Sequence, residues 1–217
     1  MKDTGLTRTG RARREDLVAA AIRVIVRDGL AMASVERIAV EAGTSKGTAL
    51  YHFGGKEAIF EALVTELYAK GRAAMTERVD LEANVPQRLR AYLEANLRFI
   101  AEHGDHVLAV QRIVNVAGIS APEDGVTELR MLLEEGQRQG ALPRFDVDVA
   151  ARTIRLTIDA VSFHLPAVAS AQVDHVIDEM VALTLRSVGV DLAALDNRPQ
   201  EAGARHDDHR QHTGQSG

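Results

Sequence analysis

The chain has 217 residues, which is enough for one or two small domains with a sizeable core. Hydrophobic residues make up 46% and charged residues 26%, an ordinary globular composition that excludes a collagen-like, a wholly disordered or a membrane-embedded protein. The absence of cysteine excludes disulfides, thiol chemistry and cysteine-bound zinc, and the scarcity of aromatic residues, 4%, argues against a base-stacking RNA-binding sheet.

The net charge of −5 is unevenly distributed along the chain. Residues 1–60 carry a net charge of +3 and the remainder −8, so only the front of the chain is suited to a polyanion. The first fourteen residues are polar and basic and lack the apolar segment of a signal peptide. The apolar stretch at 17–22 is far shorter than the roughly 20 residues that span a membrane. We therefore expect a soluble, cytoplasmic protein.

The first part of the chain shows helical periodicity and no strand signals. Apolar residues at helical spacing follow Arg14 and predict a helix that ends at Gly29. Ser34 is a suitable N-cap for a short second helix, which Gly43 breaks. A third short helix follows, and a longer one begins at Lys56 after two glycines. The predicted helices before the long one cover residues 14–28, 35–42 and 45–52.

Five more helices are predicted in the second part, and prolines mark several of their boundaries. They cover residues 86–103, 105–117, 126–139, 147–164 and 172–188. About nine helices joined by short loops predict an all-α fold. We expect a flexible basic arm at 1–13, a DNA-binding head at 14–60, a helical body at 61–190 and a disordered polar tail at 191–217.

Residues 34–53 place two short helices around one tight turn, which is the pattern of a helix-turn-helix. In such a unit the N-terminal residues of the second helix contact base edges in the major groove of DNA. Short polar side chains and one long cation lie there, and Gly47 lets the backbone approach closely. The candidates for DNA contact in this helix are Thr44, Ser45, Lys46, Gly47 and Thr48.

Four segments of this region resemble the tetracycline-repressor (TetR) family of bacterial transcription regulators. They are Asp28-Gly29, Ser34-Val35-Glu36-Arg37-Ile38-Ala39, Ala42-Gly43-Thr44-Ser45-Lys46-Gly47 and the run from Tyr51 to Phe60. The later Glu134–Gly140 segment with Phe145-Asp146 is similar to a weaker family feature. The family commonly has a phosphate-contacting tyrosine where this chain has Leu50. The resemblance therefore assigns DNA contact here to Tyr51, His52 and Lys56, and we add Arg11 and Ser34.

The resemblance implies a three-helix DNA-binding head on a larger helical body that binds a small molecule and forms a homodimer through its last two helices. Ligand binding in that body would change the spacing of the two heads. We therefore expect a repressor that a small organic ligand releases from a palindromic DNA operator. We expect no enzymatic activity, no cofactor, no metal and no membrane partner.

Polar residues on apolar helices mark two possible ligand contacts. Gln111 and Asn115 lie four residues apart, and Asp159 interrupts the apolar run 154–163. Such groups either pair with each other in a core or line a pocket, and the sequence leaves both open. With the nearby rings of Phe99 and Phe163 they form the predicted ligand site. A broad apolar stripe at 173–188 fits a second subunit or the monomer's own core.

Two other functions stay open at this point. The three-helix head could bind another protein, as an adaptor does, or the helical bundle could be an enzyme. Residues 43–47 match the G-x-S-x-G pattern of hydrolases, but that motif needs a preceding strand, which is missing here. His103 and His106, and the tail histidines at 206, 209 and 212, fit polar turns and a solvated tail better than a metal site.

Overall fold

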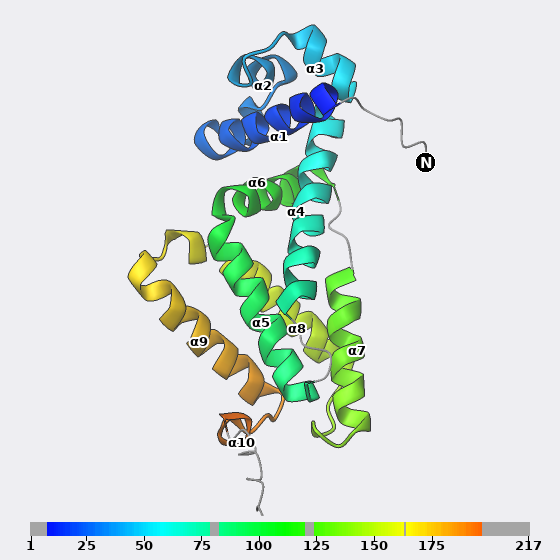
Figure 1. The fold of residues 1–217 in the computed structure, drawn as a ribbon, viewed down its shortest axis with the longest axis vertical. Helices are drawn as coiled ribbons and strands as arrows, with labels where there is room; N and C mark the ends of the chain where they lie inside the picture. The colour runs from blue at the N-terminus through cyan, green and yellow to red at the C-terminus, as the bar shows by residue number, and fades with distance from the viewer. Residues whose placement is uncertain (1–7, 79–82, 120–123, 163, 197–217) are drawn as a thin grey trace, which may run out of the picture.

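The computed structural model describes residues 8–78, 83–119, 124–162 and 164–196, and these form helices without strands (Figure 1). Three helices make a head at one end: α1 (Arg8–Asp28), α2 (Val35–Glu41) and α3 (Lys46–Phe53), with the 3-10 turn η1 (Leu30–Met32) after α1. The long helix α4 (Lys56–Arg78) runs from this head into the body. The predicted all-α architecture with an N-terminal helix-turn-helix head is therefore confirmed.

The body contains α5 (Val85–Glu102), α6 (Gly104–Ala117), α7 (Asp124–Arg138), α8 (Val147–Val161) and α9 (Ser170–Ser187). The 3-10 turn η2 (Leu165–Ala167) precedes α9, and the short α10 (Leu192–Asp196) follows it. Helix α6 crosses beneath the head and packs against α1 (Figure 1). Head and body are therefore connected in two ways. Helix α4 continues from one into the other, and α6 of the body packs against α1 of the head.

Side-chain caps set the starts of several helices. Ser34 and Ser45 accept hydrogen bonds from backbone N–H groups of the first turns of α2 and α3. Asn84 and Gln87 form a reciprocal capping box at α5, and Asp146 caps α8. Each cap satisfies an N–H group that the helix itself cannot pair. Local sequence therefore fixes where the helices of both head and body begin.

Several predicted ranges differ from the helices of the structure. The arm predicted at 1–13 is in part helical, because α1 begins at Arg8; this exposed turn buries nothing and so shows no apolar periodicity. The division at 60/61 falls inside α4, which head and body share. Helix α8 ends at Val161, before residue 164, and the predicted tail contains α10, where Asp191 Oδ1 accepts from the Ala193 N–H at 3.0 Å. The rest of the tail lies outside the described residues.

Candidate functional site

The turn between α2 and α3 is tight and internally bonded. Gly43 has a φ of 64°, a conformation that residues with a Cβ rarely adopt. The Thr44 N–H donates to the Ala39 carbonyl at 2.9 Å, and the Ser45 hydroxyl accepts from the Thr48 N–H at 3.0 Å. These bonds fix the angle at which α3 leaves the turn.

Helix α3 has a buried and an exposed side. Ala49 and Phe53 are buried and anchor it to the rest of the head. Ser45, Lys46 and Gly47 at its N-terminal end are exposed, while Thr44 and Thr48 are half-buried. Lys46 lies 4.0 Å from Glu36 with both side chains well exposed, a contact too weak to hold the ammonium in place. The predicted base-contacting residues therefore lie together on one accessible helix end.

The acidic residues at the base of the head are paired with arginines. Arg23 and Arg27 contact Glu41 at 2.8 and 3.0 Å, and Arg27 and Arg37 contact Asp28 at 2.9 and 3.1 Å. The hydrogen bond from Arg27 lowers the pKa of Asp28, and that from Arg23 lowers the pKa of Glu41. These three arginines therefore neutralise the negative charge of Asp28 and Glu41 within the head.

The remaining DNA candidates surround α3. Arg11 is exposed on the first turns of α1, whose N-terminal end lies beside α3 (Figure 1). Tyr51 is 84% exposed and packs edge-on against the His52 ring. Among the described residues, His52 Nδ1 is buried without a partner, so that nitrogen cannot reach DNA in this conformation. The Lys56 Nζ lies 5.6 Å from the centre of the Phe60 ring at the start of α4.

Arg14 has a structural role that sequence reasoning missed. Its Nη1 donates to the His52 carbonyl at the end of α3, and its guanidinium lies 4.0 Å from the centre of the Phe53 ring. The residue thus clamps α1 onto α3, although it belongs to a basic run that predicts only solvent or phosphate contact.

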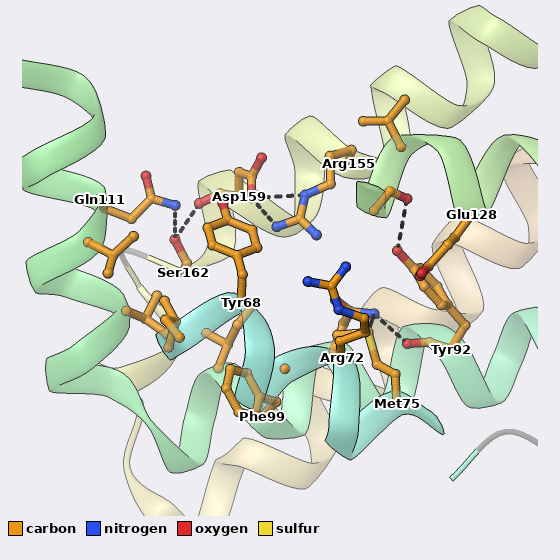
Figure 2. Close-up of a pocket in the computed structure, with 18 residues that line it drawn as sticks. Tyr68, Arg72, Met75, Tyr92, Phe99, Gln111, Glu128, Arg155, Asp159 and Ser162 are labelled. Atoms are coloured by element: carbon orange, nitrogen blue, oxygen red, sulfur yellow. Dashed lines mark hydrogen bonds and ion pairs between the residues drawn. The ribbon is translucent and has the colours of Figure 1, made fainter. Parts of the chain in front are cut away.

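A hollow of about 260 Å³ lies in the body, among side chains of α4, α5, α6, α7 and α8 (Figure 2). Its apolar wall includes Leu67, Met75, Phe99, Ile100, Val107 and Val110. A mostly apolar enclosure with a few polar groups is the usual form of a small-molecule site. We refer to this space as the inner hollow.

The polar wall of the inner hollow is an ordered network. Gln111 Nε2 donates to the Ser162 hydroxyl at 3.0 Å, and that hydroxyl donates to the Asp159 carbonyl at 2.5 Å. Arg155 Nε donates to Asp159 Oδ1 at 3.1 Å, and its Nη2 contacts the same oxygen. Burial opposes the charge on Arg155, but the hydrogen bond and the charge of Asp159 outweigh burial and raise the Arg155 pKa. Arg155 therefore stays protonated.

Two tyrosines complete this wall. The Tyr92 hydroxyl donates to the Gly125 carbonyl at 3.2 Å, whereas the Tyr68 hydroxyl has no hydrogen-bond partner among the described residues. Burial raises the pKa of both phenols, so each remains a protonated donor at neutral pH.

The structure brings three of the five predicted ligand residues together: Phe99, Gln111 and Asp159 all line the inner hollow. Asn115 does not line it and is exposed, because it lies one turn further along α6, in the last turn of that helix. Asn115 therefore lies apart from the other predicted ligand residues that the structure describes. Phe163 lies outside the described residues. Sequence reasoning missed Arg155, although an Arg four residues before Asp159 on a helix is a recognisable ion-pair spacing.

The two histidines near the junction of α5 and α6 serve packing. His103 stacks on the Phe99 ring with centroids 4.2 Å apart, and His106 Nε2 lies 3.0 Å from the Leu63 carbonyl of α4. Burial lowers the pKa of His106. Over the described ranges, no three metal-ligating side chains gather into a possible metal site.

In the part of the chain that the structure describes, no helix is both long and apolar enough to cross a membrane.

A sequence model for bacterial regulatory proteins of the tetR family matches residues 17–63. The chain is 38% identical over 87 residues to the HTH-type transcriptional regulator BetI of Vibrio vulnificus, covering 39% of this chain and 43% of BetI. It is 29% identical over 155 residues to the repressor KstR2 of Mycobacterium tuberculosis, covering 67% and 78%. The matched region thus spans less than half of BetI.

Solved structures share the fold over most of the chain. A tetR-family regulatory protein from Rhodococcus RHA1 superposes with a TM-score of 0.74 at 23% identity, covering 82% of this chain and 98% of that one. The TetR-family regulator PfmR of Thermus thermophilus gives 0.67 at 22% identity, covering 78% and 97%. These relatives are transcription regulators, so neither the adaptor nor the enzyme alternative is favoured.

Proposed function

We propose that the chain is a ligand-responsive repressor of the TetR family, which the tetR-family match at residues 17–63, the similarity to the repressor KstR2 and the shared fold all support. It binds a pseudo-palindromic operator as a homodimer and leaves it when a small organic molecule occupies the inner hollow. The protein acts in the cytoplasm, where its DNA lies, and catalyses no reaction.

The observation that carries this proposal is the exposed N-terminal end of α3. Ser45, Lys46 and Gly47 project from a helix that a capped, glycine-centred turn holds in place. The unpaired N–H groups and positive dipole end of such a helix attract phosphate, and its first side chains can reach base edges. The pairing of Asp28 and Glu41 with arginines removes negative charge that would otherwise repel DNA.

The experiment is selection of binding sites by the full chain from a random duplex library, followed by affinity measurements over a range of salt concentrations. We expect a two-fold symmetric site whose half-site centres lie about 34–36 Å apart or a multiple of that. Lys56→Gln and Arg11→Gln should each make the salt slope shallower by about 1. Arg144→Gln, which changes an exposed loop arginine by the same charge, serves as the control.

Substitution of Lys46 or Thr48 should change the preferred base, by about 1–3 kcal/mol for each favourable base interaction that is removed. A uniform decrease over all sequences would show that these side chains only position α3. Selection of no preferred sequence at all would contradict the proposed function.

A further inference from the structure

A second, wider hollow of about 740 Å³ adjoins the inner one. The two share four lining residues, Arg72, Met75, Tyr92 and Glu128. The wider hollow, which we call the outer hollow, extends between α4, α5 and α7. Together the two volumes fall within the usual size range of small-molecule sites, and their shared residues make one elongated space.

The two ends of this space differ in chemistry. The inner hollow is closed by buried apolar side chains, including Leu67, Phe99 and Val107. The outer hollow is rich in charged residues, several of them exposed: Arg72, Arg88, Glu128, Glu134, Glu135 and Arg138. An elongated molecule that enters through the outer hollow would therefore place its apolar part innermost.

Hydrogen-bond donors gather where the apolar part ends. Figure 2 shows the guanidinium groups of Arg155 and Arg72 pointing toward each other across the inner hollow, with Tyr68 alongside. Asp159 Oδ1 takes two of the five N–H donors of Arg155, and the Tyr92 hydroxyl is also in hydrogen-bond contact with this guanidinium, which leaves about two donors for other acceptors. The Tyr68 hydroxyl is a further donor without a partner among the described residues.

The acidic groups of the inner hollow are less available. Asp159 is already held by Arg155, so a cationic ligand would have to compete with a guanidinium for it. Glu128 is exposed, as Arg72 is, so water and salt screen the charge of both, whereas Arg155 is half-buried. A carboxylate, in contrast, would meet arginine donors in the planar geometry that guanidinium recognises best.

We propose that the ligand is an elongated amphipathic carboxylate whose hydrocarbon part fills the inner hollow and whose acidic group binds Arg155, Arg72 and Tyr68. This inference rests on the proposed function, because it assigns a ligand to the regulator's pocket.

The test compares three probes of equal chain length by calorimetric titration of the full chain: dodecanoate, dodecanol and dodecyltrimethylammonium, all below their micelle-forming concentrations. We expect dodecanoate to bind at least about 10-fold more tightly than either of the others, the gain of one charge-assisted hydrogen bond. Equal or tighter binding of the cation or the alcohol, or binding of none of the three, would overturn the proposal.

Variants locate the acidic group. Arg155→Gln should weaken dodecanoate binding about 10-fold or more and change dodecanol binding less than about 3-fold. Tyr68→Phe, which removes only a hydroxyl, should weaken dodecanoate selectively as well. Arg144 is not among the described residues that line either hollow, so Arg144→Gln should change the binding of neither dodecanoate nor dodecanol. If Arg155→Gln unfolds because Asp159 loses its partner, the double variant Arg155→Gln/Asp159→Asn removes both charges and should show the same selective loss.

A parallel titration of the selected operator separates the two proposals. Selective dodecanoate binding without any loss of DNA affinity would contradict the ligand-responsive function but not the ligand class. A second outcome is that operator binding is intact, that none of the three probes changes it, and that the protein does not bind dodecanoate selectively. This outcome would contradict the ligand class and leave the DNA-binding function standing.

Discussion

Gly136 of α7 has no room for a side chain. A Cβ at this position would lie 2.6 Å from Leu142 Cδ1 and 2.9 Å from Val85 Cγ1, so these two side chains pack directly against the bare backbone of α7. The adjacent Gln137 donates to the carbonyls of Pro143 and Phe145, both at 3.0 Å. The Glu134–Gly140 segment, which resembles a family feature, therefore has a structural role in closing the turn into α8.

We predict that Gly136→Ala destabilises the protein. Overpacking a filled site costs about 1–3 kcal/mol, of which the better helix propensity of alanine recovers up to about 1 kcal/mol. Thermal unfolding should show a melting temperature lower by several degrees, since about 1 kcal/mol shifts a chain of this size by roughly 2–4 °C. An unchanged or higher melting temperature would show that Leu142 and Val85 move aside without cost.

Gly47 of α3 is the opposite case. A Cβ added here would have Ser45 Oγ as its nearest atom, at 3.7 Å, which is an ordinary contact, and the residue is exposed. Gly47→Ala should therefore leave stability unchanged or raise it by up to about 1 kcal/mol. If the α3 backbone approaches DNA here, operator affinity should nevertheless fall. Measuring melting temperature and operator affinity on the same samples distinguishes the two effects, and full affinity would exclude close approach at Gly47.

At the scale of whole helices, α6 joins the inner hollow to the head. Its Val107, Val110 and Gln111 line the hollow, and the next residue, Arg112, donates through Nη1 to the carbonyls of Ile25 and Val26 in α1, at 3.1 Å for Val26. A ligand that shifts α6 must therefore strain or break bonds to a helix of the DNA-binding head.

We predict that Arg112→Gln uncouples ligand from DNA. Coupling between sites is typically 1–3 kcal/mol, and residues along a connecting network change it by about 0.5–2 kcal/mol. Saturation with the tightest-binding alkyl probe should therefore lower operator affinity less in this variant than in the unaltered protein. The variant should still bind that probe. The control is Arg98→Gln, which breaks an ion pair of 2.7 Å to Asp174 within the body. A similar loss of response in both variants would show that the effect comes from general destabilisation of the body and not from the bonds of Arg112 to α1.

The start of α2 was predictable because its cap, Ser34, is a local signal. Asn84 and Asp146 cap α5 and α8 in the same way, a signal that the predicted ranges did not use. The early start of α1 was not, because Arg8 to Arg14 bury little and leave no periodic pattern. Gln111 and Asp159 were recognisable as polar residues in apolar runs. Arg155 and Tyr68 come together only where α8 meets α4, and Asn115 lies outside the inner hollow because spacing along a helix does not show where the neighbouring helices end.

The whole molecule must present two heads if it reads a two-fold symmetric operator, since one α3 covers only a half-site. Helices α8 and α9 correspond to the last two helices predicted from sequence. They leave large apolar side chains exposed in the single chain: Leu156 of α8 is 68% and Leu183 of α9 61% exposed. Other residues of the apolar stripe predicted at 173–188, such as Ile177 and Val188, are buried within the monomer. Only part of that stripe is therefore available to a second subunit.

We predict that Leu156→Asp and Leu183→Asp convert the dimer to monomers. A carboxylate buried in an apolar interface costs several kcal/mol unless it is paired, so the dimer dissociation constant should rise by about 100-fold or more. Sedimentation velocity over a range of concentrations measures this, and operator affinity should fall in the same variants because each half-site would then be bound alone. Met131→Asp, at an equally exposed position on α7, is the matched control. Dimers that survive both substitutions but not Met131→Asp would place the interface on α7 and leave α8 and α9 as free surface.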